Sequence, residues 1–140
     1  MKPFLSILLS SVFITLSILH LYWVFGGKKG LNKALPTEKD GKRVLNPKKH
    51  EILMVSIGLL VFSFYYFLKT EILTIELPKF VSEYSGWIIS IIFCIRAIGD
   101  FKYVGFFKKV KNTEFGKFDT KYFSYISLLI GVIGVLLQIL

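Results

Sequence analysis

Hydrophobic and polar positions lie in long separate blocks along the chain instead of alternating at a short period. Asp, Glu, Lys and Arg are absent from residues 3–25, 52–68, 84–95 and 122–140. A helix that crosses the hydrocarbon of a bilayer needs about 20 mostly apolar residues, with roughly 17–25 the usual range. Three blocks have that length, and the remaining one reaches it when it is extended to 80–98. The pattern therefore predicts four membrane-spanning helices.

These blocks place the chain in the class of all-α integral membrane proteins. Four spans in 140 residues leave no soluble domain, so residues 1–140 are expected to form a single transmembrane domain. Short connections make consecutive spans antiparallel, which predicts an antiparallel four-helix transmembrane bundle with cytoplasmic loops at 28–51 and 99–121. The first block follows Lys2 as a signal peptide would. Its length and the lack of a small-x-small cleavage site favour a retained span.

The basic residues are concentrated in two of the loops. Of 18 Lys and Arg, eight lie in residues 28–51 and seven between Arg96 and Lys121. The positive-inside rule places both basic loops in the cytoplasm and both termini outside. The net charge of +9 then reflects topology and attraction to anionic lipid head groups. Membrane lipids are the expected partners, and nucleic acid is not.

Small residues mark where the helices are expected to pack. In the fourth span Ser124, Ser127, Gly131 and Gly134 recur at steps of three and four, so they share one face of a helix. A similar stripe of serines in the first span ends at His20. Lipid tails provide no hydrophobic drive for helix association, so small residues mark close backbone approach. We interpret these stripes as helix-packing seams.

Polar and aromatic side chains gather at the predicted cytoplasmic boundary. Ionisable residues within spans are candidates for function. His20 is expected to point into the bundle and reach polar groups of the third span or of the cytoplasmic segment that adjoins it. The candidate ligand-binding set comprises His20, Tyr22, Trp23, Arg96, Asp100, Tyr103 and Asp119. These groups could bind a phosphate head group or move a proton, and they could equally tie helix ends together.

Two local structures are expected from the spacing of these residues. Arg96 and Asp100 are four residues apart, so they are expected to form an ion pair on one helix face. Asp119 or Thr120 is expected to cap the fourth helix, where a carboxylate suits the positive end of the helix.

The second basic loop interleaves aromatic residues with lysines. Tyr103, Phe106, Phe107 and Val110 have helical spacing. This predicts a cytoplasmic interfacial helix between spans three and four, either continuing the third span or lying along the inner membrane surface. The lysines of the loop are expected to extend outward to anionic lipid.

No sequence motif names a reaction. HExxH, paired Cys/His metal spacing, GxGxxG and the Walker lysine are all absent, so no metal or cofactor is expected and the catalytic residues are unknown. Cys94 is the only cysteine and therefore has no disulfide partner within the chain.

Three segments carry a resemblance to a known family. HLYWVFGG, RAIGDFKYVGFFKKV and FGKFDTKYFS follow the ordered pattern HxYWxxGG, RxxGD, FxxxD. In this the chain resembles an uncharacterised bacterial family of four-span membrane proteins built on a domain of unknown function, over nearly its whole length. The matching positions are His20, Tyr22, Trp23, Gly26, Gly27, Arg96, Gly99, Asp100, Gly105 and Asp119. The resemblance implies a multi-pass protein of the bacterial inner membrane and supplies no activity.

Three functions remain open at this stage. The first is binding of a lipid or amphiphile in a pocket near the cytoplasmic face, lined by His20, Arg96 and Asp100. The second is a membrane-embedded isomerase-type enzyme that uses His20 and an aspartate as acid and base. The third is a transporter or an accessory subunit of a larger membrane complex, or of a homo-oligomer. No Asp or Glu lies within the four uncharged blocks of the predicted spans, which argues against proton-coupled export.

Overall fold

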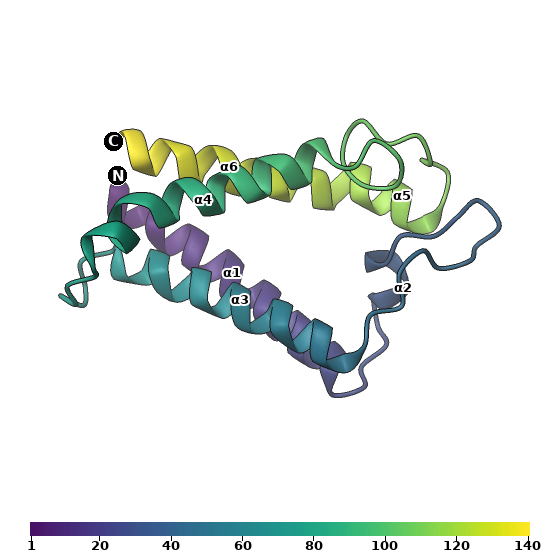
Figure 1. Ribbon diagram of the computed structural model, residues 1–140, viewed down its shortest axis with the longest axis horizontal. Coiled ribbons are helices and arrows are strands. Elements are labelled where there is room, and N and C mark those ends of the chain that lie inside the picture. The colour runs from purple at the N-terminus through teal and green to yellow at the C-terminus, as the bar shows by residue number, and fades with distance from the viewer.

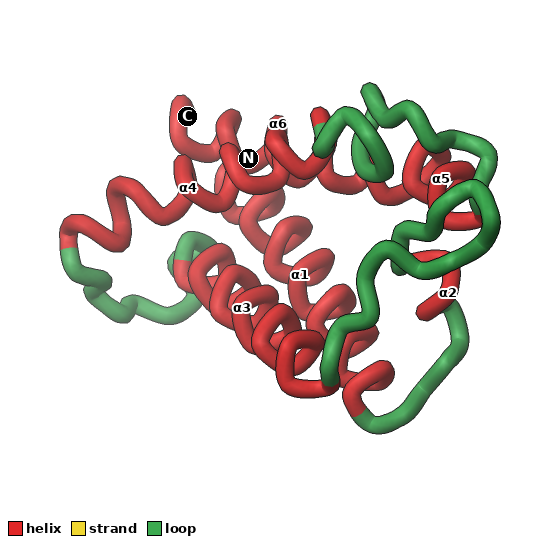
Figure 2. Tube along the Cα trace, turned by 45° about the vertical axis from the view of Figure 1, so that its right-hand side comes forward, coloured by secondary structure: helices red, strands yellow, loops and turns green.

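The computed structural model describes all residues from Met1 to Leu140 and contains no β-strand (Figure 2). Its four long helices are each long and apolar enough to cross a membrane. They are α1 (Lys2–Val24), α3 (Lys49–Leu68), α4 (Lys79–Ile98) and the continuous helix Glu114–Ile139. The predicted all-α fold with four spanning helices is confirmed.

The fourth long helix is made of three consecutive parts. It begins with α5 (Glu114–Phe118), passes through the π-helical turn η1 (Asp119–Phe123) and continues as α6 (Ser124–Ile139). A further short helix, α2 (Leu31–Ala34), lies in the loop between α1 and α3.

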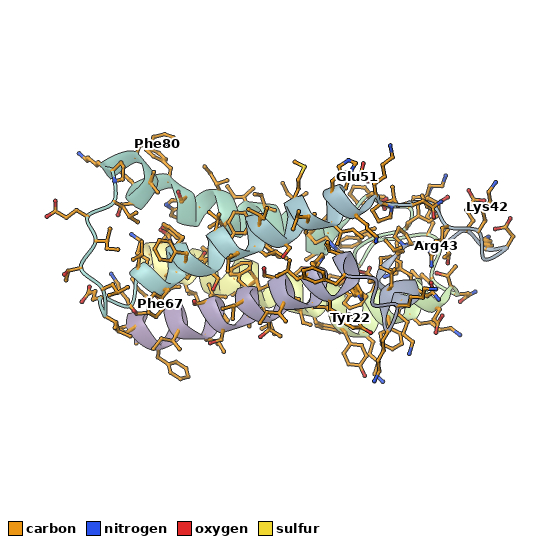
Figure 3. All side chains as sticks on the ribbon, turned by 90° about the horizontal axis from the view of Figure 1, so that it is seen from below. Tyr22, Lys42, Arg43, Glu51, Phe67 and Phe80 are labelled. Atoms are coloured by element: carbon orange, nitrogen blue, oxygen red, sulfur yellow. The ribbon has the colours of Figure 1, made fainter.

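The four long helices form two antiparallel pairs. Figure 1 shows α1 beside α3 and α4 beside α6, with both chain termini at one end of the molecule. The two pairs approach each other near the termini and diverge toward the opposite end, where α2 contacts α5. We call this opposite end, with residues 25–48 and 99–118, the basic end. Lys42 and Arg43 project there, while Phe67 and Phe80 lie at the terminal end (Figure 3).

Serines join α1 to α3. The hydroxyl of Ser10 donates to the carbonyl oxygen of Ser63 at 2.9 Å, and the hydroxyl of Ser63 donates to the carbonyl oxygen of Ser10 at 2.8 Å. Ser17 and Ser56 repeat this exchange one heptad further along, at 2.8 and 2.9 Å. Small side chains let the two backbones come close enough for these bonds, so the hydroxyls of these four serines are all paired across the seam.

Glycines join α4 to α6. A Cβ atom built on Gly131 would lie 2.5 Å from Sγ of Cys94, and one on Gly134 would overlap Oγ of Ser90. Ser124 and Ser127, on the same stripe of the helix, are also buried. The stripe expected to pack in the fourth span therefore faces α4.

The hydrophobic core connects the two pairs in the half of the bundle nearer the termini. Phe13 is fully buried at its centre. Its ring stacks on Tyr66 at a centroid distance of 5.7 Å and meets Phe93 edge-on at 5.2 Å. The buried core residues are Leu9, Phe13, Leu59, Tyr65, Tyr66, Ile89 and Ile130. Because this contact lies in the terminal half, the helices are free to diverge at the basic end.

The structure corrects the expected helix between spans three and four. Residues 99–113 form an irregular loop, because α4 ends at Gly99 with φ +89° and the backbone of Val104 approaches so closely that a Cβ atom would not fit. The fourth long helix begins at Glu114, earlier than expected. Thr113 caps it by accepting the Gly116 N–H at 2.9 Å, so the prediction of a cap at Asp119 or Thr120 was wrong.

Candidate functional site

Asp119 is the centre of a buried polar cluster at the basic end. Its side chain has no exposed surface and accepts hydrogen bonds on both carboxylate oxygens. Oδ1 accepts from Nη2 of Arg96 at 2.8 Å. Oδ2 accepts from the Gly105 N–H at 2.8 Å, from Nζ of Lys108 at 3.0 Å and from the Ser124 hydroxyl at 3.1 Å. We call these five residues the Asp119 cluster.

The π-helical turn explains why Ser124 reaches this carboxylate. In a π-helix the backbone bonds join residues five apart, and such turns occur frequently at functional sites. Asp119 opens the turn and Ser124 follows its last residue, so the two side chains lie on the same face. Ser124 was expected only as a packing residue, yet it also binds the carboxylate.

Asp100 folds the loop that delivers two members of the cluster. Its Oδ1 accepts the backbone N–H groups of Lys102, Tyr103 and Val104 at 2.8–2.9 Å. Partial burial would raise the pKa of Asp100, but these N–H donors outweigh that effect and hold its pKa below the ordinary value. The Phe106 N–H then donates to the carbonyl of Ala97, which returns the loop to the end of α4.

The expected ion pair between Arg96 and Asp100 is therefore not formed. The helix ends between these residues, so they do not share a helical face. Arg96 instead pairs with Asp119, which is 23 residues away in the sequence. Asp100 is a loop-folding residue outside the cluster.

Lys108 is the member of the cluster that sequence reasoning missed. All loop lysines were expected to extend outward, but the Lys108 side chain is fully buried. Its Nζ donates to Asp119 and to the carbonyl of Gly105 at 2.8 Å. Lys109, the next residue, is exposed. Nothing in the local sequence distinguishes the two lysines.

The cluster carries a net positive charge because one carboxylate faces two cations. Arg96 uses only Nη2 in a hydrogen bond, while its Nη1 is buried without any partner. The rest of the side chain is not enclosed, since 32% of its surface is exposed. A buried donor without an acceptor costs roughly 1–3 kcal/mol. Arg96 therefore keeps N–H donors that no acceptor in the protein occupies, on a side chain that is only partly enclosed.

His20 does not join this cluster. Its Nδ1 lies 2.7 Å from the carbonyl oxygen of Leu16 on its own helix, and its ring meets Trp23 edge-on at 5.0 Å. The expected contact with polar groups of α4 or of the loop that follows it is not formed, because α1 and α4 belong to different pairs that diverge at this end. By helix rise, His20 and Arg96 both lie about 26 Å from the terminal ends of their helices. The two residues therefore lie at a similar depth along their helices, but on different helix pairs.

The remaining aromatic candidates shape the loops. Trp23 donates from Nε1 to the carbonyl of Lys29 at 3.0 Å. The Tyr22 ring covers Gly27 so closely that a Cβ atom there would overlap it. Tyr103 is half-buried and lines an open pocket of about 400 Å³ between the two basic loops. The other residues lining that pocket are Glu38, Lys39, Asp40, Lys102 and Val110.

Fold and site together define a small integral membrane protein with four spans and a buried ionic cluster at one end. Residues 13–134 match the family described as "Protein of unknown function (DUF3995)", and the chain belongs to this family. No curated protein and no solved structure matches the chain. The resemblance to an uncharacterised membrane family is confirmed.

Proposed function

We propose that this protein binds an anionic, phosphate-bearing lipid or amphiphile at the Asp119 cluster, with Arg96 as the contact residue. The observation that carries this proposal is that the Arg96 guanidinium donates through Nη2 only, while its Nη1 has no partner in the protein. A guanidinium offers five N–H donors in a planar fork that matches phosphate oxygens. The second cation, Lys108, also neutralises Asp119, which leaves positive charge on Arg96 for a ligand.

The depth of the cluster supports a lipid head group as the source of the phosphate. Arg96 lies in the last turn of α4 and pairs with Asp119, which the exposed basic residues Lys117 and Lys121 flank in the sequence. Lipid phosphates are found at the same boundary, while acyl chains lie along the apolar helix surfaces. A basic end of this kind attracts anionic lipids.

The geometry favours binding over acid–base catalysis. Asp119 already accepts four hydrogen bonds, and Asp100 accepts three backbone N–H groups, so each carboxylate is held in its ionised form. His20 is bonded to its own helix. An isomerase would need an acid and a base near one substrate, and these residues do not supply that pair.

The same proposal includes the orientation of the protein in a bacterial inner membrane. Both basic loops lie at one end and both termini at the other (Figure 1). The positive-inside rule then assigns the basic end to the cytoplasm. A cysteine at Asn32 in a Cys94→Ala background should resist an impermeant thiol reagent in intact cells. Labelling of this cysteine without permeabilisation would show that the protein has the opposite orientation.

The binding proposal is tested by comparing the only two arginines of the chain. Arg96→Lys keeps a charge that can pair with Asp119 but removes the fork, whereas Arg43→Lys changes an exposed loop residue that bonds Asn32. Native mass spectrometry of the purified protein with phosphatidylglycerol should show binding about tenfold weaker in Arg96→Lys, equivalent to about 1.4 kcal/mol. Arg43→Lys should bind as the wild type does.

Two results would contradict the proposal. Equal phosphatidylglycerol binding by wild type and Arg96→Lys would remove Arg96 from any lipid site. Displacement of the lipid by inorganic phosphate would instead identify a soluble phosphate compound as the ligand. Melting temperatures of both variants, measured in the same detergent, separate a loss of binding from a loss of folding.

A further inference from the structure

The loop between α4 and α5 exposes two phenylalanine rings side by side. Phe101 and Phe107 are 58% and 63% exposed, and their ring centroids lie 6.3 Å apart. Phe106 lies between them in the sequence, but its ring packs edge-on against Tyr125 at a centroid distance of 5.0 Å. We call Phe101 and Phe107 the aromatic wedge. Not every side chain of this loop is exposed, because Lys108, the residue after Phe107, is buried.

The loop holds the wedge in a fixed and strained conformation. Phe101 has φ +63°, a left-handed conformation that bulky residues rarely adopt. Asp100 binds the three N–H groups that follow Phe101. The N–H groups of Lys109 and Val110 both donate to the carbonyl of Lys102, at 3.1 and 2.9 Å. Strain of this kind persists only where several surrounding contacts hold the backbone in place, and it is typical of functional segments.

We propose that the aromatic wedge inserts into the boundary between head groups and acyl chains of the leaflet at the basic end. The loop begins one residue after the last residue of α4, Ile98, and runs beside α5 (Figure 1), which places it at the level of the membrane surface. Exposed apolar rings gain free energy when they leave water for that boundary. This contact is independent of the proposed ligand site at Arg96.

Charge complementarity identifies a lipid surface as the partner. Lys102, Lys109 and Lys111 are exposed in the same loop as the two rings. Aromatic rings flanked by lysines combine insertion with attraction to anionic head groups. The wedge therefore anchors the loop, which also carries Gly105 and Lys108 of the Asp119 cluster.

The test places a polarity-sensitive fluorophore on the wedge. Phe107→Cys in a Cys94→Ala background is labelled with NBD and reconstituted into vesicles of phosphatidylcholine and phosphatidylglycerol. Lys42→Cys is the control, because Lys42 is exposed at the outer tip of the other basic loop (Figure 3). We expect a blue shift and strong quenching by head-group spin-labelled lipid at position 107, with neither effect at position 42. The blue shift should decrease in pure phosphatidylcholine vesicles.

Two outcomes would overturn the inference. One is an NBD signal at position 107 that is as water-exposed as that at position 42. The other is a signal that is water-exposed in vesicles but shifted in native membranes, which would identify a protein as the partner. Phe101→Cys provides a second labelling position if Phe107→Cys fails to reconstitute.

Discussion

Nζ of Lys108 and Oδ2 of Asp119 form an ion pair of 3.0 Å in which neither side chain has exposed surface. Removing two charges from water is expensive, and their attraction offsets that penalty only when the remaining donors and acceptors are also satisfied. Here Arg96, Gly105 and Ser124 complete the coordination of the carboxylate. The pair fastens the loop 99–113 to the fourth long helix.

The first prediction follows from the contrast between adjacent lysines. Lys108→Met should lower the free energy of unfolding by about 3–5 kcal/mol, because it leaves the buried Asp119 carboxylate with one cation fewer. Lys109→Met is the matched control and should change stability by less than about 0.5 kcal/mol, since Lys109 is exposed. Equilibrium unfolding of the purified variants in detergent measures both values. Similar values for the two variants would contradict the buried ion pair.

A second prediction concerns the acid sensitivity of the loop. Because three N–H groups bind the ionised carboxylate, the pKa of Asp100 is lower in the folded loop than in the unfolded chain. The stabilisation is therefore complete above the unfolded pKa of about 3.9 and is lost as pH falls through the lower folded value. Asp100→Asn should increase hydrogen exchange of residues 102–104 at neutral pH, whereas the wild-type loop should loosen only below about pH 4.

The control for this prediction is Asp40→Asn. Asp40 also accepts a backbone N–H, from Lys42 at 3.0 Å, but in the other basic loop. Its substitution should leave exchange in residues 102–104 unchanged. Equal protection of those amides in Asp100→Asn and wild type would show that the carboxylate does not hold the loop.

Local patterns were sufficient to predict the spans and their packing faces. Apolar length identifies a membrane helix, and steps of three and four identify one face of it, so both features can be predicted without knowing the partner helix. Gly131 and Gly134 could therefore be placed on a seam before the partner, α4, was known.

The contacts of the cluster could not be predicted in the same way. Arg96 has a carboxylate four residues away and another 23 away, and the near one fails only because Gly99 ends the helix. The aromatic spacing after Asp100 suggested a helix, but Gly99 and Gly105 both have positive φ and turn the chain. The path of the loop in the folded protein decides which of its lysines becomes buried. A single sequence does not show this.

A third prediction compares two glycines within the spans. Gly131→Leu should destabilise the protein by about 1–3 kcal/mol through overpacking, because its new side chain meets Cys94 on α4. Gly58→Leu is the control, since no atom lies within 4 Å of a Cβ built at that position. Thermal unfolding in one detergent should separate the two variants. A silent Gly131→Leu would show that α6 does not pack on α4 through this stripe.

The last prediction concerns His20, whose hydrogen bond and ring contact both lie within its own helix. Its only hydrogen bond is to the Leu16 carbonyl, which also accepts the regular backbone bonds of the helix, so no partner on α4 is left unsatisfied when the imidazole is replaced. His20→Phe should therefore change the free energy of unfolding by less than about 0.5 kcal/mol. Aromatic rings are also suited to this depth in a membrane.

Stability and phosphatidylglycerol binding should be measured together on His20→Phe, with His50→Phe, at an exposed position of α3, as the control. Unchanged stability with weakened lipid binding would place His20 in the ligand site, facing Arg96 across the diverging helix pairs. Unchanged values of both would make His20 a boundary residue that packs on Trp23. A loss above about 1 kcal/mol would contradict the prediction, because a loss of that size indicates a buried polar partner.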